Sequence, residues 1–122
     1  MAARTYTMRW LTLEDIKDQL RIPHDFTDED NTLKRYGSTA ENFTLRYLQR
    51  TEAELKAMND KDQTQVPDDI VSATLVLVEE YYKHRGTISE RNMYLIDYSY
   101  DALVMPYRRG TYSSDSTDEL NV

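Results

Sequence analysis

The chain has 122 residues, which predicts one domain with a modest core, and its 15 basic and 22 acidic residues give a net charge of −7. This acidic balance argues against a protein that grips a nucleic-acid backbone or an anionic membrane. The absence of cysteine excludes disulfides and thiolate metal sites. We find no signal peptide and no apolar stretch long enough to span a bilayer, so we expect a protein of a soluble compartment.

The N-terminal part is expected to form a short extended arm, residues 1–11, followed by a short helix. Thr12 precedes Asp15 by three positions, which is the spacing of a capping box at a helix start. Pro23 is expected to stop this helix, because the residue before a proline disfavours helical backbone. Three apolar residues then share one helical face: Leu13, Ile16 and Leu20.

A longer helix is predicted from about residue 28 to about residue 50. It starts in an acidic turn, where negative charge favours a helix N-terminus. Gly37 and Ser38 weaken its middle, so we expect a kink or break there. Its apolar stripe steps by three and four residues: Leu33, Tyr36, Ala40, Phe43 and Tyr47.

The central apolar segment of the chain follows a short helix and a polar loop. Thr51 with Glu54 repeats the capping pattern, and the loop 59–65 has no apolar residue. Pro67 suits the first position of the next helix, and Gly86 is a natural C-cap. This helix is apolar around most of its circumference, which predicts a buried helix at the centre of the fold. One stripe holds Ile70, Ala73, Thr74, Leu77, Val78 and Tyr81, and a second holds Val71, Leu75 and Tyr82.

The C-terminal part is rich in tyrosine. Tyr94, Ile96, Tyr98 and Tyr100 alternate with other residues, which predicts an extended segment. One more helical turn, closed by Pro106, is expected next. We therefore predict an all-α fold, a small bundle of about four to five helices around a central helix at about 67–85. The expected domain spans 1–109, and 110–122 form a flexible acidic tail.

The sequence offers little chemistry of the kind that enzymes need. Glu80 and His84 are four residues apart and could share a metal, but an exposed ion pair at a helix end is favoured, because a metal site needs more ligands. The acidic run 25–30 lacks the glycine and the distal glutamate of a calcium loop, so a solvated helix start is favoured there. We therefore expect no catalytic site, no metal and no cofactor.

Three segments together resemble the head-tail connector, or adaptor, proteins of tailed bacteriophages. They are "LTLEDIKDQLRI" near the start, "VPDDIVSATLVLVEEYYKHRG" in the centre and "ALVMPYRR" near the end, in that order over about residues 10–109. The resemblance implies a small helical subunit of a ring, which would hold about twelve copies, beneath the portal vertex of the capsid. Such a ring extends the DNA channel and provides a platform for tail, tail-completion or stopper proteins.

The resemblance also implies partners and a location. The partners would be other copies of the chain, the portal protein and a tail-completion or stopper protein, with DNA passing through without specific binding and no membrane involved. The location would be the virion neck, after assembly in the bacterial host cytoplasm. The region after the last helix would reach the portal, so the candidate portal-docking residues are Pro106, Tyr107, Arg108, Arg109 and Tyr112.

Two further sets of residues are candidates for the ring. Tyrosine gives a large contact area at low entropic cost, so the apolar helix and the tyrosine-rich segment are expected in the core or between subunits. Acidic residues would repel the DNA backbone and let it slide. The intersubunit or core candidates are Ile70, Leu77, Tyr81, Tyr82, Tyr94 and Tyr98, and the lumen-facing candidates are Asp25, Asp28, Glu29 and Asp30.

Two other classes of protein stay open on the sequence alone. A small acidic helical interaction module or regulator would have the same composition, and it predicts a dimer or a hetero-complex rather than a ring. A DNA-binding helical domain could use "RTYTMRW" or "PYRRG" as its basic contact. It predicts salt-sensitive DNA binding.

Overall fold

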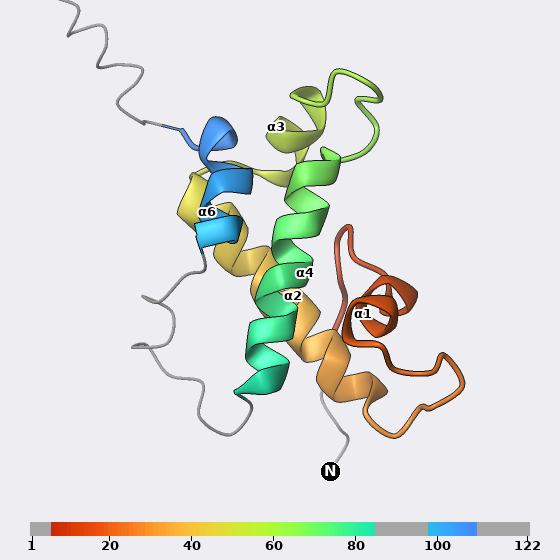
Figure 1. The fold of residues 1–122 in the computed structure, drawn as a ribbon. Helices are drawn as coiled ribbons and strands as arrows, with labels where there is room; N and C mark the ends of the chain where they lie inside the picture. The colour runs from red at the N-terminus through yellow and green to blue at the C-terminus, as the bar shows by residue number, and fades with distance from the viewer. Residues whose placement is uncertain (1–5, 85–97, 110–122) are drawn as a thin grey trace, which may run out of the picture.

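The computed structural model describes residues 6–84 and 98–109, and these ranges are entirely helical or irregular, without a strand. The all-α prediction is confirmed. The helices, in chain order, are α1 (Leu13–Leu20), α2 (Asp30–Leu48), α3 (Glu52–Ala57), α4 (Asp68–Lys83) and α6 (Tyr98–Val104), and a 3₁₀ turn, Met105–Tyr107, follows α6 (Figure 1).

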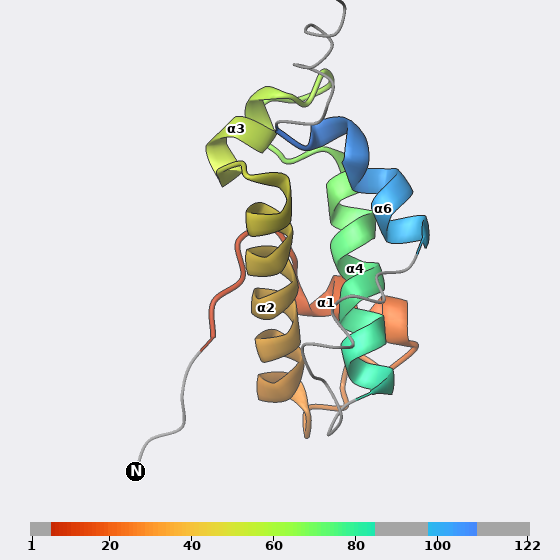
Figure 2. The same cartoon turned by 90° about the vertical axis from the view of Figure 1, so that its left-hand side faces the viewer.

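Two long antiparallel helices, α2 and α4, form the centre of the bundle. Helix α1 packs against both of them, and α6 packs against α4 (Figure 1). Helix α3 lies at the end of the bundle where α2 finishes and α4 begins (Figure 2). The arrangement leaves one side of α2 and one side of α4 uncovered by the other described helices.

The core is built around α4, as its apolar stripe predicted. The six residues of the first stripe are buried, whereas Val71, Leu75 and Tyr82 of the second stripe are half-buried and pack against the edge of the core. Burial of this kind stabilises the fold by about 25 cal/mol for each Å² of apolar surface. The buried apolar residues are Leu11, Ile16, Leu33, Tyr36, Ala40, Leu48, Leu55, Val66, Ile70, Ala73, Leu77, Val78, Tyr81, Tyr100 and Val104.

The helix starts follow the predicted capping chemistry. The Asp15 amide donates to Thr12 Oγ1 at 3.0 Å, and Thr51 and Glu54 form a reciprocal capping box at 3.1 and 2.9 Å. Each bond satisfies an amide that has no partner inside its helix. Helix α4 begins at Asp68, so Pro67 is its N-cap and not its first residue.

The two predicted helix stops were placed less well. Helix α1 already ends at Leu20, because Arg21 adopts left-handed backbone with φ of 61° and the Ile22 amide turns back to the Lys17 carbonyl at 2.8 Å. Pro23 therefore lies beyond the stop. Helix α4 ends at Lys83, and Gly86 is outside the described residues.

The predicted break at Gly37 was wrong, because α2 runs unbroken through its 19 residues. Gly37 is buried, and the side chains of Met8 and Ile16 fill the space that a Cβ atom would occupy there, with Ile16 Cδ1 only 3.0 Å from that position. The glycine marks a close approach between the N-terminal arm and α2.

The prediction of extended backbone at Tyr98 and Tyr100 was also wrong, since both belong to α6. Tyr100 and Val104, four residues apart, are fully buried on one face of this short helix. The Tyr100 hydroxyl pairs with Thr44 Oγ1 at 2.9 Å, and its ring lies 6.0 Å from that of Tyr47. Packing on α2 and α4 thus decides the conformation, and Tyr94 and Ile96 lie outside the described residues.

Candidate functional site

The end of the described chain is fastened to the C-terminal end of α2 through Arg108 and Arg109, whose contacts with residues 47–49 we name the C-terminal clasp. The Arg109 amide donates to the Leu48 carbonyl at 2.8 Å, Arg109 Nε donates to the Gln49 carbonyl at 2.9 Å, and Arg108 Nε donates to the Tyr47 carbonyl at 3.0 Å. The last carbonyls of a helix have no partner within it and carry its negative dipole end, so positively charged donors are well suited to them.

Further contacts surround this clasp. Arg50 Nε donates to the Tyr107 carbonyl at 2.9 Å, and the Arg108 guanidinium lies 4.6 Å from the centre of the Tyr47 ring. Arg109 also forms an ion pair with Glu54, whose pKa it lowers. Of the predicted portal-docking residues, Arg108 and Arg109 thus have partners inside the chain, Tyr107 is half-buried and Pro106 is exposed. Tyr112 lies outside the described residues.

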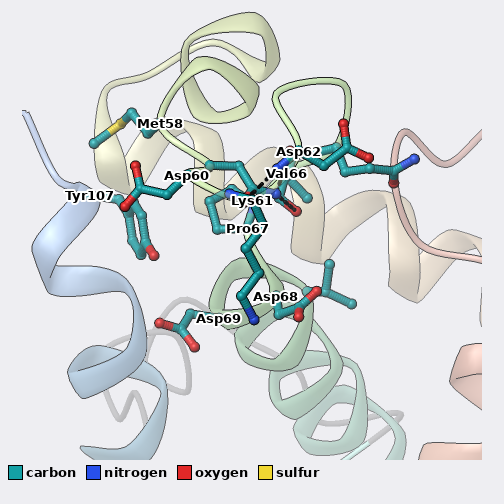
Figure 3. A pocket seen from close by; sticks show the side chains of 12 residues that line it. Met58, Asp60, Lys61, Asp62, Val66, Pro67, Asp68, Asp69 and Tyr107 are labelled. Carbon is teal, nitrogen blue, oxygen red and sulfur yellow. Dashed lines mark hydrogen bonds between the residues drawn. The ribbon is translucent and has the colours of Figure 1, made fainter.

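An acidic pocket of about 460 Å³ opens beside Tyr107, between the 58–67 loop and the start of α4 (Figure 3). Its floor is apolar, with Val66 and Pro67 buried, and Tyr107 forms one wall. Burial and the neighbouring carboxylates of Asp69 and Asp60 raise the pKa of Tyr107. The carboxylates of the lining are Asp60, Asp62, Asp68 and Asp69, and Lys61 is its one basic residue.

The acidic turn between α1 and α2 is held by one buried lysine. Lys17 is 3% exposed, and its Nζ donates to the His24 carbonyl at 3.1 Å and to the Phe26 carbonyl at 2.8 Å. Asp30 Oδ1 lies 2.9 Å from the same atom, in a direction that makes an ion pair and not an aligned hydrogen bond. A buried ammonium needs such partners, since an unpaired one is costly.

This anchoring separates the four acidic residues that were predicted to face a lumen. Asp25 and Asp28 are exposed, whereas Glu29 is half-buried and accepts a hydrogen bond from the Tyr82 hydroxyl at 3.0 Å. Asp30 is half-buried against Lys17. The four residues therefore lie in one turn, with two of them free to present their charge to solvent.

The start of the chain is fastened to α2 by an N-terminal clasp. The buried carboxylate of Glu41 accepts the backbone amides of Arg9, Trp10 and Leu11 at 2.7, 2.8 and 2.9 Å. Burial raises the pKa of Glu41, and the three amides and the Arg9 charge oppose that rise. The Trp10 indole then donates to Thr74 Oγ1 on α4 at 3.1 Å.

The predicted intersubunit or core residues divide into three groups: those in the core, one at its edge, and those that the structure does not describe. Ile70, Leu77 and Tyr81 lie in the core of the single chain, where burial raises the pKa of Tyr81 to about 12. The Tyr81 ring lies 6.1 Å from that of Tyr36. Tyr82 is half-buried at the edge. Tyr94 and the side chain of Tyr98 are outside the described residues.

Sequence reasoning missed Lys17 and Glu41, although a signal for both was present. Lys17 is four residues after Leu13 and three before Leu20, so it shares the apolar face of α1. Glu41 is four residues after the buried Gly37 and seven before the buried Leu48. A charged residue at an apolar helical position indicates a buried partner.

The possible metal site at Glu80 and His84 lies within the described ranges. Glu80 and His84 form an ion pair of 3.5 Å at the exposed end of α4, and no group of three metal-ligating side chains occurs in 6–84 and 98–109. No helix in these ranges is both long enough and apolar enough to cross a bilayer. The described surface carries a fastened chain end, an acidic pocket and an acidic turn.

These features describe a small helical protein with anchored chain ends and charged surface regions. The sequence matches the family described as Phage gp6-like head-tail connector protein over residues 11–108, and the chain belongs to that family. It is therefore a structural connector protein of bacteriophages, and the resemblance seen in its three segments is confirmed. No curated protein and no solved structure matches the chain significantly.

Proposed function

We propose that this chain assembles as a ring beneath the portal vertex in the virion neck, where it extends the DNA channel and provides the docking platform for tail-completion or stopper proteins. The observation that carries the proposal is the family match over residues 11–108, which includes every described helix. Closed cyclic assembly from repeated head-to-tail contacts is the arrangement that a subunit of this kind needs to surround DNA.

The portal-docking role falls on the C-terminal region. Arg108 and Arg109 hold the end of the described chain against α2, beside the exposed Pro106, and residues 110–122 follow them in the sequence. A tail of Ser, Thr and Asp that orders on binding suits a contact with a larger assembly. In this proposal the clasp holds the chain next to that contact, and the tail, which includes Tyr112, binds the portal.

The channel-facing role falls on the acidic turn. Asp25 and Asp28 carry exposed charge on a turn that Lys17 holds in place. Negative charge along a channel repels DNA phosphates, so DNA slides without binding. A ring structure that buries these residues between protomers would contradict this assignment.

Two experiments test the proposal. Light scattering with negative-stain images of the purified chain, alone and with the portal protein of the same phage, is expected to show rings; a stable dimer in both samples would favour a small regulator.

Truncation after Arg109 is expected to lower portal affinity at least about tenfold, since the tail supplies the contact. Truncation of residues 1–5 is the control and should leave affinity unchanged. Unchanged binding by the chain truncated after Arg109 would contradict the docking role.

A further inference from the structure

The exposed face of α2 is basic although the protein is acidic. The exposed residues of this helix are Asn31, Arg35, Thr39, Asn42 and Arg46, and none of them is a carboxylate. Neither of the two arginines forms an ion pair with any residue in the described ranges. By contrast, the arginines at 9 and 109 both pair with glutamates. We name these five residues the α2 stripe.

The exposed face of α4 carries the opposite charge. Its exposed or half-exposed carboxylates are Asp68, Asp69, Glu79 and Glu80, of which Glu79 pairs with the exposed Lys83 at 3.6 Å and Glu80 with His84 at 3.5 Å. Asp68 and Asp69 form no ion pair with a described residue, so the face is most acidic near the start of the helix. Because α2 and α4 bury their apolar faces against each other, their exposed faces point away from each other. Helix α6 flanks α4, so part of the side of α4 that faces away from α2 is covered (Figure 2). One side of the subunit is therefore locally basic and the other locally acidic.

The charges on the two helices have the same spacing. Arg35 and Arg46 are eleven residues apart, and so are Asp69 and Glu80. Eleven residues make three turns of an α-helix, about 16 Å, and return to nearly the same side of it. Each helix thus presents two charges in line along one face.

The charges also lie toward matching ends of the two helices. Trp10 bridges Glu41 of α2 and Thr74 of α4 through two hydrogen bonds, so these two residues mark where the middles of the helices meet. From there Arg46 is five residues toward the α3 end on α2, and Asp69 is five residues toward the same end on α4. Each is therefore about 7 Å away along its own helix.

The second pair matches in the opposite direction. Arg35 is six residues below Glu41 on α2, and Glu80 is six residues below Thr74 on α4. Figure 1 shows that α2 and α4 cross at an angle, so a contact between copies matches the ends of the two faces and not a whole line of charges. Arg46 is then directed toward Asp69, and Arg35 toward Glu80.

We propose that neighbouring copies of this chain contact each other through the α2 stripe of one and the acidic face of α4 of the next, with Arg46 entering the acidic pocket near Asp69 and with Arg35 opposite Glu80. The proposal rests on the ring proposed above and names its contact surfaces. The contact is heterologous, since it uses two different surfaces, and heterologous contacts are those that close rings.

The acidic pocket suits an arginine side chain. Its rim of Asp60, Asp68 and Asp69 offers acceptors to a guanidinium beside the Lys61 side chain, whose nitrogen lies between Asp68 and Asp69 (Figure 3). Its apolar floor at Val66 and Pro67 suits the aliphatic stem. Asp69 already interacts with Tyr107, and its second oxygen can accept from a guanidinium. The acidic turn lies to the side of the α2 and α4 pair, so this contact leaves it free (Figure 1).

The test reverses the charges of each surface in turn. Arg35→Glu with Arg46→Glu places carboxylates against carboxylates, and Asp69→Arg with Glu80→Arg places arginines against arginines. Each double variant is expected to raise the concentration needed for assembly at least about tenfold, because like charges across an interface are strongly unfavourable. Sedimentation velocity, alone and with the portal protein, measures it.

A mixture of the two double variants makes the test specific. In an equimolar mixture every contact can again join opposite charges, if the two kinds of copy alternate, so assembly is expected to recover to within about threefold of the unaltered chain. Glu14→Arg is the control, because it reverses one charge at an exposed residue of α1, outside both surfaces. It should leave assembly unchanged, and thermal melting checks that every variant is folded.

The outcomes separate this inference from the proposed function. Rings that form equally well from both double variants, or a mixture that does not recover, would overturn the contact and leave the ring standing. A chain that never assembles, alone or with the portal, would overturn both. Loss of DNA retention in Arg35→Glu with Arg46→Glu, at unchanged sedimentation, would mean that the α2 stripe binds DNA, and it would also overturn the contact.

Discussion

The two ends of the described chain are fastened to the same helix by opposite chemistry. At the N-terminal clasp, three backbone amides converge on one buried carboxylate, Glu41. At the C-terminal clasp, Arg108 and Arg109 spread their donors over the last carbonyls of α2, and both remain partly exposed. The comparison shows that a buried clasp concentrates its stability in one side chain, whereas an exposed clasp distributes it over several weaker contacts.

Replacing the acceptor of the N-terminal clasp is expected to have the largest effect. Glu41→Ala leaves three amides without their acceptor, at about 1–3 kcal/mol each, so we expect the free energy of unfolding to fall by about 4 kcal/mol. Urea denaturation measures the loss. Glu41→Gln keeps one acceptor oxygen and should lose about half as much. A loss below about 1 kcal/mol for Glu41→Ala would show that the arm is not held by this carboxylate.

The close approach at Gly37 should give the next largest effect. Gly37→Ala places a methyl group where Met8 packs, so we expect a loss of about 1 kcal/mol despite the better helix propensity of alanine. When Met8 is also alanine, the same substitution should become stabilising. A double-mutant cycle by thermal melting compares the two backgrounds. Equal effects in both would mean that the arm does not touch Gly37.

Breaking one part of the C-terminal clasp should cost less than losing Glu41. Arg108→Ala removes a hydrogen bond to the Tyr47 carbonyl and a contact with the Tyr47 ring, so we expect a loss of about 1–2 kcal/mol. Arg46→Ala, measured in dilute samples, is the matched control, and its effect should stay within about 0.5 kcal/mol. A larger effect for Arg46 than for Arg108 would contradict the placing of Arg108 in the clasp and of Arg46 on the exposed surface.

The smallest expected effect is on the pH dependence of stability, and its sign distinguishes the two clasps. Arg109 lowers the pKa of Glu54, so this contribution is fully present above the ordinary pKa of glutamate and is lost as the pH falls through the lowered value. Burial raises the pKa of Glu41, so stability falls as the pH rises from the ordinary value through the raised one. The two clasps thus respond to pH with opposite sign.

Urea denaturation between about pH 3 and pH 7 tests this contrast. Glu54→Gln should flatten the loss of stability on the acid side, whereas Glu41→Gln should remove a component that declines as the pH rises. Two variants with the same change of slope would contradict the assignment of opposite shifts.

The helices of this protein follow from local patterns that sequence displays directly. The caps at Thr12 and Thr51 and the apolar stripes of α2 and α4 were predictable, because they depend on residues within a few positions of each other. The match of the three segments to a connector family was predictable for a related reason, since it requires only their order.

The errors arose where distant residues decide the structure. Gly37 looks like a helix breaker until Met8 is known to lie on it, 29 positions earlier in the sequence. Tyr98 and Tyr100 alternate like a strand, but burial of Tyr100 and Val104 selects a helix. The same holds for the predicted docking residues, because neither spacing nor composition shows that Arg108 and Arg109 meet the end of α2.

The two clasps also define how the subunit would carry tension. Residue 41 and residues 47–49 belong to one helix, so a pull between the arm and the tail passes along a single short stretch of α2. The arm is also tied to Thr74 of α4 through Trp10, and the other clasp to Glu54 of α3 through Arg109. A subunit pulled at its two ends would therefore load α2 first and reach α3 and α4 only through these single side chains.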